Sequence, residues 1–295
     1  MRVFLTGATG FIGSAIVPEL INAGHQVLGL TRSDAGAQSL IAAGAEVHRG
    51  DLEDLESLRS GATKADGVIH CAFDHNFANW VANCEKDQRA IEALGGALTG
   101  SDRPLVITSG TGMGNAVPGQ LATEDVFNST GQNPRVVSEL AGASMSEAGV
   151  NVSVVRLPQV HDTVKQGFVT YAVAIAREKR VSAYVGDGKN RWPAAHVSDV
   201  ARLYRLALEK REPGARYNAV GEEGIAVRAV AEVIGRGLKV PVVGLSPEEA
   251  AGHFGWLAPF AGMDLPASSA QTQARLGWRP TGPGLIADLE RMSYA

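Results

Sequence analysis

The 295-residue chain contains only two cysteines, Cys71 and Cys84, and neither lies in a Cys-x-x-Cys pair or in a Cys/His spacing typical of metal sites. Two free thiols are typical of a reducing compartment, so we expect a cytoplasmic protein that binds no metal ion. No run of about 18 apolar residues occurs, so no membrane-spanning helix is predicted. An apolar strand is expected to begin at residue 2, which leaves no room for a secretory leader.

Positive charge is also limited. The chain has 27 Lys and Arg against 31 Asp and Glu, a net charge of −4, and no long basic run. A nucleic-acid-binding surface is therefore not expected. An anionic ligand would have to be held by local dipoles and a few well-placed cations. Hydrophobic residues make up 45% of the chain, which is ordinary for a folded core, and the length allows one large domain or two unequal ones.

Glycines stand at a regular spacing near the start of the chain, between a short apolar strand and a helical pattern. Gly7 permits a tight turn, Gly10 lets the backbone approach a pyrophosphate, and Gly13 lets the helix pack on its strand. The helix N-terminus offers free N–H groups and a positive dipole to an anion. Such a turn can also be purely structural, but the strand before it, the helix after it and a second strand at 25–30 favour a dinucleotide site. Its expected ligands are Gly7, Thr9, Gly10, Phe11, Ile12 and Gly13.

The residues after the second strand bear on the choice between NAD and NADP. An NAD site generally has an Asp or Glu here that binds the ribose 2′-hydroxyl. This chain has Thr31, Arg32 and Ser33 instead. A guanidinium beside hydroxyl groups suits a 2′-phosphate, so we expect NADP(H), bound by Arg32 and Ser33, to be preferred over NAD. In the alternative interpretation Arg32 is a solvated surface residue and Asp34 binds the ribose.

Apolar strands alternate with helical segments through the first half of the chain. Strands are expected at 2–5, 25–30, 45–48, 67–72, 103–110 and 151–156. This rhythm is typical of an α/β Rossmann-type fold, a doubly wound parallel sheet with its ligand crevice at the carboxyl ends of the strands. We expect a dinucleotide-binding domain over 1–157, to which a helix at 199–209, capped by Ser198, and a strand at 216–220 return. A smaller substrate-binding lobe, with a helix at 225–234, is expected over 158–295.

Six segments carry a family resemblance. They are Thr6 to Gly13, Asp51-Leu52, His70-Cys71-Ala72, Thr108-Ser109-Gly110, and the segments 156–161 and 196–201. Together they resemble the extended short-chain dehydrogenase/reductases, a superfamily that includes NAD(P)-dependent epimerases and dehydratases, over nearly the whole chain. The resemblance implies that Asp51 and Leu52 lie at the adenine, Ala72 and Phe73 beside the ribose and pyrophosphate, and Pro158 and Val160 near the nicotinamide. Thr108 is expected to reach the crevice at the end of its strand.

The family's active helix carries Tyr-x-x-x-Lys, which supplies the proton, and a serine on the preceding strand orients the carbonyl. Ser109 matches the serine, but no tyrosine of this chain has a lysine four residues later. Arg135 stands in place of the tyrosine and Glu139 in place of the lysine, so the chain looks like an atypical member. At i and i+4 these two side chains can pair with each other. Alternatively, Arg135 stabilises an oxyanion or binds a substrate carboxylate, and Glu139 acts as a base if burial raises its pKa.

Other residues are candidates for the proton source or for the pocket wall. His161, Asp74, His75 or a water held by Ser109 could supply a proton. We expect Asp74, His75, Thr111, Met113 and Trp192 to line the substrate pocket, although a loop cap, a flexible loop and core packing are the respective alternatives. The apolar segment 253–260 could cover the cleft or form a dimer contact, but lobe core is favoured.

These observations predict an NADPH-dependent oxidoreductase that reduces a small organic carbonyl or imine by hydride transfer. A protonated imine brings its own proton, so loss of the tyrosine would matter least for that class. One alternative is an NADP(H)-binding sensor without turnover. The other is a nucleotide-sugar epimerase or dehydratase, which is disfavoured because its chemistry uses the absent tyrosine and usually NAD. The expected partner is a small-molecule substrate, with no nucleic acid and no membrane, and a homodimer is possible.

Overall fold

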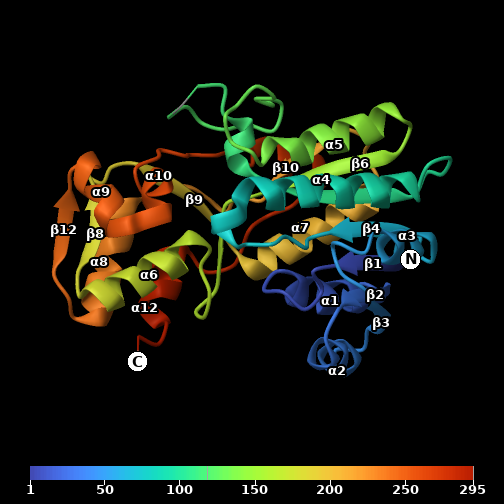
Figure 1. Ribbon diagram of the computed structural model, residues 1–295, viewed down its shortest axis with the longest axis horizontal. Helices are drawn as coiled ribbons and strands as arrows, with labels where there is room; N and C mark the ends of the chain where they lie inside the picture. Colours follow the sequence, from blue (N-terminus) through green and yellow to red (C-terminus); the bar gives the residue numbers. More distant parts are fainter. Residues whose placement is uncertain (118, 295) are drawn as a thin grey trace.

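Seven parallel strands form the central sheet of the computed structural model, which describes residues 1–117 and 119–294 (Figure 1). Their order across the sheet is β10-β6-β5-β4-β1-β2-β3. Because the chain runs outward from β1 to β3 and then returns to β4 beside β1, the strand order reverses between β1 and β4. A crevice at the carboxyl ends of β1 and β4 is where such a sheet binds its ligand. The strands are β1 (Arg2–Thr6), β2 (Gln26–Thr31), β3 (Glu46–Arg49), β4 (Gly67–His70), β5 (Pro104–Gly110), β6 (Asn151–Leu157) and β10 (Arg216–Asn218).

Helices cover both faces of this sheet, as Figure 1 shows. Successive residues of a strand point to opposite faces. Val3 and Leu5 accordingly pack with α1 (Gly13–Asn22), α2 (Asp34–Ala42) and α7 (Val197–Lys210), whereas Phe4 packs with α3 (Leu55–Thr63), α4 (Trp80–Gly96) and α5 (Val136–Glu147). Burial on both faces explains why the strands read as continuous apolar runs. The expected Rossmann-type α/β fold is confirmed.

Apart from α7, β10 and α11 (Ala270–Leu276), the part of the chain after β6 builds a smaller lobe around two short sheets. One sheet has the order β11-β9-β7, and the other pairs β8 with β12. Helix α8 packs most of its apolar face against α6, Trp192 and α12. Helix α11 instead packs against β10 and α7. The elements of the lobe are β7 (Gln159–His161), α6 (Phe168–Lys179), β8 (Ser182–Val185), β9 (Arg191–His196), β11 (Glu222–Ala226), α8 (Val227–Leu238), β12 (Val242–Leu245), α9 (Pro247–Phe254), η3 (Gly255–Leu257), α10 (Ala258–Ala261) and α12 (Leu285–Arg291).

Two local expectations require correction. Helix α7 begins at Val197, and its N-cap is His196 rather than Ser198, because the His196 Nδ1 accepts the Ser198 N–H at 3.3 Å. The helix expected at 225–234 begins later, at Val227, because residues 222–226 form strand β11. Within the described residues, no helix combines the length and the apolar character that a membrane crossing requires.

Candidate active site

The predicted cofactor residues all follow the carboxyl ends of strands that lie side by side. They come after β1 (Gly7, Thr9, Gly10, Phe11, Ile12, Gly13), β2 (Arg32, Ser33), β3 (Asp51, Leu52), β4 (Ala72, Phe73) and β6 (Pro158, Val160), and Thr108 lies near the end of β5. Parallel strands place these segments along one edge of the sheet. The fold therefore brings them together around the crevice, although it does not assign a ligand atom to each.

The glycine loop has the geometry that a pyrophosphate site requires. Gly7 has φ +70°, and a Cβ there would lie 2.7 Å from the Ala72 nitrogen. A Cβ on Gly13 would lie 2.0 Å from the Gly7 carbonyl oxygen, because the first turn of α1 packs directly on the loop. No side chain caps α1, and the N–H groups of residues 11–13 have no hydrogen-bond partner within the described chain, so they are available to an anion. These residues fit a dinucleotide cofactor.

Polar side chains fix the ends of the neighbouring strands. The Thr6 hydroxyl accepts the Ala72 N–H at 3.2 Å and bonds to His70 Nδ1 at 2.7 Å. The Thr108 hydroxyl donates to the His70 carbonyl at 2.7 Å and bonds to the Tyr204 hydroxyl at 2.7 Å. These bonds hold residues 71–73 against the glycine loop. Burial raises the pKa of the nearby Cys71 thiol to about 11, so this thiol stays protonated and unreactive.

At the end of β2, Arg32 is exposed and has no hydrogen-bond or ion-pair partner among the residues that the structure describes. Its neighbour Ser33 caps α2 by accepting the Gly36 N–H at 3.1 Å. The Asp34 carboxylate is paired with Arg49 at 2.5 Å, so it is already engaged and less suited to bind a ribose. The Asp51 carboxylate closes its own loop by accepting the N–H groups of Glu53 and Asp54.

Arg135 and Glu139 do not pair with each other, although their i, i+4 spacing left that alternative open. The Arg135 guanidinium lies 2.6 Å from Asp87, donates to Ser138 at 2.9 Å and to the Thr108 carbonyl at 3.0 Å. It also lies 4.0 Å above the ring centre of Phe73. Arg135 is therefore held at the carboxyl end of β5, against the segment that follows β4.

Asp87 of α4 is the anion that holds this arginine, and it was not predicted from the sequence. It is 1% exposed and also accepts from Ser138 at 2.7 Å and from His70 Nε2 at 3.1 Å. Burial disfavours its charge, but Arg135 and His70 outweigh that effect and hold the pKa of Asp87 below its usual range. A sequence signal existed: Asp87 falls on the buried stripe of α4 with Cys84, Ile91 and Leu94, where a carboxylate needs a cationic partner.

Glu139 belongs to a separate, structural ion cluster. Both of its carboxylate oxygens lie 2.8 Å from the fully buried guanidinium of Arg156, and Arg216 approaches at 3.1 Å. Arg156 also donates to the carbonyls of Thr123 and Val126, which fixes the loop before α5. Because Glu139 is 1% exposed and its carboxylate oxygens accept from two arginines, this carboxylate is not open to a substrate. The interpretation of Glu139 as a base is therefore withdrawn.

Ser109, Thr111 and Met113 are buried at the end of β5 and in the short helix η2 (Thr111–Gly114) that follows. The Ser109 hydroxyl oxygen is buried and has no partner among the described residues. A buried hydroxyl without a partner is uncommon in a folded protein. Its position beside Thr108, whose carbonyl binds Arg135, is compatible with orienting a substrate carbonyl.

His161, at the end of β7, is fully buried, and its Nδ1–H donates to Asp288 of α12 at 2.8 Å. Burial lowers the pKa of His161, although Asp288 opposes the shift. Its Nε2 is buried and unpartnered within the described chain. The imidazole is therefore expected to be neutral at pH 7, oriented by Asp288 from the smaller lobe.

Asp74 and His75 lie in the segment after β4. Hydrogen bonds from the Asn76 N–H and from Lys86 lower the pKa of Asp74, so this carboxylate is unsuited to donate a proton near neutral pH. The His75 Nδ1–H donates to the Phe73 carbonyl at 3.1 Å, which leaves Nε2 for other partners. His75 is exposed, but desolvation of its ring by the surrounding side chains and the charges of Arg135 and Lys165 lower its pKa, so its protonated form is a stronger acid than an ordinary imidazolium.

Aromatic rings from both parts of the molecule meet beside these residues. Phe77 stacks on Trp256 with ring centres 4.1 Å apart and an interplanar angle of 9°, and Tyr171 meets both rings edge-on. Phe73 and Trp80 extend the group toward Arg135, and Phe168 and Phe260 extend it into the smaller lobe. Trp256 is 40% exposed. This aromatic group forms an apolar wall next to the Arg135 guanidinium.

Two expectations about this wall are settled by burial. Trp192 is 2% exposed and lies in the core of the smaller lobe, behind Phe168, so it packs rather than lining the pocket. In the segment 253–260, Phe254 and Leu257 belong to the core of the smaller lobe, which is the role that the sequence favoured. Trp256 instead contacts Phe77 across the cleft.

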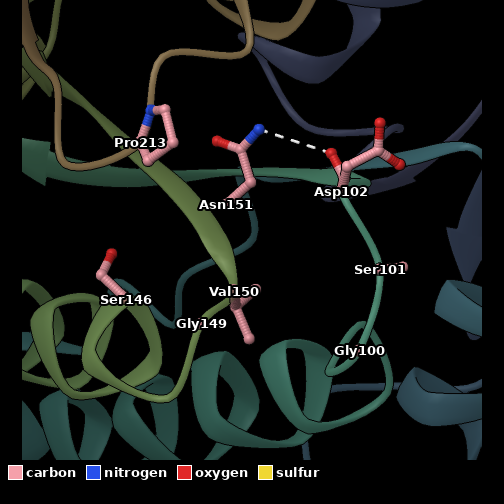
Figure 2. A pocket seen from close by; sticks show the side chains of 8 residues that line it. All are labelled: Gly100, Ser101, Asp102, Ser146, Gly149, Val150, Asn151 and Pro213. Carbon is pink, nitrogen blue, oxygen red and sulfur yellow. Dashed lines mark hydrogen bonds between the residues drawn. The ribbon is translucent and has the colours of Figure 1, made fainter.

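A pocket of about 500 Å³ lies at the opposite edge of the sheet, and Figure 2 shows its lining. Asn151, the first residue of β6, donates to the Asp102 carbonyl there at 3.4 Å (Figure 2). The amino ends of parallel strands do not form the ligand crevice of such a sheet. We therefore place the active site at the carboxyl edge. The pocket is lined by Gly100, Ser101, Asp102, Ser146, Gly149, Val150, Asn151 and Pro213.

Comparison with known proteins agrees with this geometry. The model of the NAD dependent epimerase/dehydratase family matches residues 3–220. The chain belongs to this family. Members of the family are NAD(P)-dependent oxidoreductases and epimerases, so membership supports an enzyme that binds NAD(P).

Individual relatives show how far the similarity extends. A Schizosaccharomyces pombe protein, named Uncharacterized protein C2A9.02, is 46% identical over the whole length of both chains. The UDP-glucose 4-epimerase of Streptomyces lividans is 27% identical over 95% of this chain and 92% of its own. The solved structure of DesIV, a dTDP-glucose 4,6-dehydratase from Streptomyces venezuelae with NAD and TYD bound, covers 99% of this chain and 95% of its own at 19% identity and a TM-score of 0.78. At that identity the structural likeness shows the fold alone.

Proposed function

We propose that the protein is an NADPH-dependent reductase that transfers a hydride to a small organic carbonyl or imine. The observation that carries the proposal is the position of Arg135. It occupies the place of the family's tyrosine, at the N-cap of α5, and Asp87 holds it there at 2.6 Å. A buried, permanently charged donor at this point suits a reaction in which negative charge develops on a substrate oxygen.

The donor count of Arg135 supports this role. A guanidinium has five N–H groups. Three of them serve Asp87, Ser138 and the Thr108 carbonyl, so two have no partner among the described residues. These two can bind a substrate oxygen. Because the pKa of arginine lies above about 12, Arg135 orients and stabilises the oxygen but does not deliver the proton.

We assign the proton to His75 for carbonyl substrates. Its ring lies 5.2 Å from Phe73, on which Arg135 rests, and its Nδ1–H is fixed by the Phe73 carbonyl. Reduction adds a hydride to the carbonyl carbon and a proton to the oxygen, and His75 supplies that proton through Nε2. NADPH, when bound, would supply the hydride. A protonated imine needs no such donor.

The preference for NADPH rests on Arg32. It is exposed at the end of β2 without a partner in the described chain, and the nearby Asp34 carboxylate is paired with Arg49. An unengaged guanidinium favours a 2′-phosphate over a bare ribose hydroxyl.

Two other functions are weighed against this one. The likeness to a UDP-glucose 4-epimerase favours a nucleotide-sugar epimerase. Against it, the tyrosine is replaced by Arg135, and the cleft wall near it consists of aromatic rings rather than polar partners for sugar hydroxyls. The replaced tyrosine also leaves room for a cofactor-binding sensor without turnover.

The test combines binding and turnover. Calorimetry should give a tighter dissociation constant for NADPH than for NADH, and Arg32→Ala should weaken NADPH binding by about 10–100-fold, the value of a charge-assisted contact, with little change for NADH. Arg32→Lys is the matched control that keeps the charge. NADPH consumption is then measured with a panel of ketones, aldehydes and cyclic imines, and UDP-glucose is tested for epimerisation. Equal affinity of the parent protein for both nucleotides would refute the NADP preference. Binding without turnover across the panel would favour the sensor.

A further inference from the structure

A tight hairpin links the central sheet to the smaller lobe, and it carries a lysine whose role the reaction above does not use. His161 and Gln166 pair as an antiparallel bridge at its base, and the Asp162 N–H donates to the Lys165 carbonyl at 2.9 Å. The Asp162 carboxylate accepts the N–H groups of Val164 and Lys165 at 2.7 and 2.8 Å. The turn therefore has a defined conformation, and its only carboxylate is bonded to the turn backbone.

The base of this hairpin is anchored in the protein. Gln166 is 1% exposed, its side chain donates to the Asp162 carbonyl at 3.0 Å, and its N–H donates to Thr170 of α6 at 2.8 Å. His161 is tied to Asp288 of α12. Lys165 is thus presented from a scaffold that belongs to the smaller lobe.

Lys165 reaches back to the glycine loop. Its ammonium nitrogen lies 5.8 Å from the ring centre of Phe11, which stands between Gly10 and Gly13. The same ammonium contributes to the lowered pKa of His75, in the segment after β4. Phe11 and His75 follow β1 and β4, the two strands between which the order of the sheet reverses. The ammonium therefore stands over the crevice where the cofactor phosphates are expected.

The charge of Lys165 is uncompensated. The residue is exposed and forms no ion pair with any residue in the described ranges. The first turn of α1 contains no acidic residue that could neutralise it. The chain as a whole carries −4, so binding a polyanionic cofactor depends on a few local cations. Lys86 of α4, by contrast, is already paired with Glu53 and Asp74.

We propose that Lys165 binds the pyrophosphate of the cofactor and that the hairpin 161–166 thereby joins the smaller lobe to the bound dinucleotide. Lys165 is then the counter-ion of the diphosphate, as Arg32 is of the 2′-phosphate. This inference rests on the cofactor assignment of the proposed function, but it does not depend on the reaction. It requires only that a pyridine nucleotide binds.

Binding of three probes to the full-length protein tests the inference. The probes are NADPH, NADH and adenosine 2′-monophosphate, which has a 2′-phosphate but no diphosphate. Lys165→Gln should weaken NADPH and NADH alike, by about 3–10-fold for an exposed charge, and leave adenosine 2′-monophosphate unchanged. Arg32→Ala should show the opposite pattern, with losses for NADPH and adenosine 2′-monophosphate but not for NADH. Raising the ionic strength should shrink the Lys165 effect.

Two controls keep the outcome interpretable. Lys165→Arg should retain most of the affinity, and Lys189→Gln, at an exposed lysine paired with Asp187 in the smaller lobe, should change nothing. The thermal midpoint without nucleotide should be the same for Lys165→Gln and the parent protein. Unchanged NADH and NADPH affinities in Lys165→Gln would overturn the inference, as would an equal loss for adenosine 2′-monophosphate. If Lys165→Gln weakens NADPH and NADH but not adenosine 2′-monophosphate, and yet no substrate is reduced, the reductase proposal fails while this inference stands.

Discussion

Replacing Asp87 by asparagine is expected to lower the free energy of unfolding by about 3–5 kcal/mol, the usual cost of breaking a buried ion pair by removing one partner. The substitution conserves volume, so the loss comes from electrostatics rather than from a cavity. It leaves the Arg135 guanidinium, whose residue is 8% exposed, without an anion. Such a loss is a large share of the total stability of about 5–15 kcal/mol expected for a domain.

The structure predicts that removing either partner of this ion pair is costly. Asp87 also accepts from Ser138 and His70, and an asparagine oxygen can keep one of these bonds. Arg135→Met should cost a similar amount, because it leaves the Asp87 carboxylate buried without its cation. The double variant removes both charges, so its loss should be smaller than the sum of the two single losses by about 2–3 kcal/mol.

Urea unfolding of the four proteins in this double-mutant cycle measures the coupling. Asp74→Asn serves as a control, because Asp74 pairs with Lys86 nearer the surface, and its loss should stay below about 1 kcal/mol. Additive single losses, or an Asp87→Asn variant as stable as the parent protein, would refute the view that Arg135 is held by a buried charge pair.

The Asp87–Arg135 pair also predicts how the free energy of unfolding changes with pH. The pKa of Asp87 is lower in the folded state than its unfolded value of about 3.9. The contribution of the ionised Asp87 to the free energy of unfolding is therefore fully present above that value, and it is lost as the pH falls through the folded-state pKa. The double variant lacks this titration, so its stability should fall less steeply below about pH 4 than that of the parent protein.

Two predictions concern the reaction. The pKa of His75 is lowered below its usual 6.5, so carbonyl reduction should accelerate as the pH falls through that lowered pKa, and His75→Asn should abolish this rise while sparing reduction of protonated imines. His161→Asn should keep the rise, and an unchanged profile in His75→Asn would contradict the proton assignment. Trp256→Ala removes the ring stacked on Phe77, so the KM for aryl ketones should increase about 2–10-fold more than the KM for aliphatic ketones of similar size. Equal changes for both classes would show that the wall does not contact substrate.

The sequence predicted the fold well because the signals for it are local. Apolar runs bounded by glycine and polar caps locate the strands, and the alternation with helices determines that the sheet is parallel. The expected fold class and the family membership are confirmed. The predicted N-cap of α7 was wrong because the helix begins one residue earlier, at Val197, and a histidine side chain, which is not a typical cap, accepts the N–H of Ser198.

The partners of the charged residues on α5 could not be predicted from their spacing alone. Arg135 and Glu139 are neighbours on one helix, yet Arg135 meets Asp87 of α4 and Glu139 meets Arg156 of β6. These contacts are long-range, and each gives a buried charge the opposite charge that it requires, whereas an i, i+4 pair forms on a helix surface. The sequence does contain a signal for these pairs, namely charged residues at positions expected to be buried. Asp87 lies on the apolar stripe of a helix, and Arg156 lies within an apolar strand. A buried charge needs an opposite charge beside it. Pairing Asp87 with Arg135, and Arg156 with Glu139, on this ground would have predicted both ion pairs.

This division of partners predicts what happens when the family's motif is restored. The double variant Arg135→Tyr and Glu139→Lys recreates Tyr-x-x-x-Lys, but the new lysine would stand against the buried guanidinium of Arg156 and beside Arg216, three cations without an anion. Asp87 would simultaneously lose its cation. Each broken buried pair costs about 3–5 kcal/mol, so together they approach the whole stability of a domain. We therefore expect the double variant to be largely unfolded by circular dichroism. A folded and more active double variant would show that Arg135 and Glu139 are incidental replacements. An unfolded double variant would show that the side chains packed around α5 no longer accommodate the family's tyrosine and lysine.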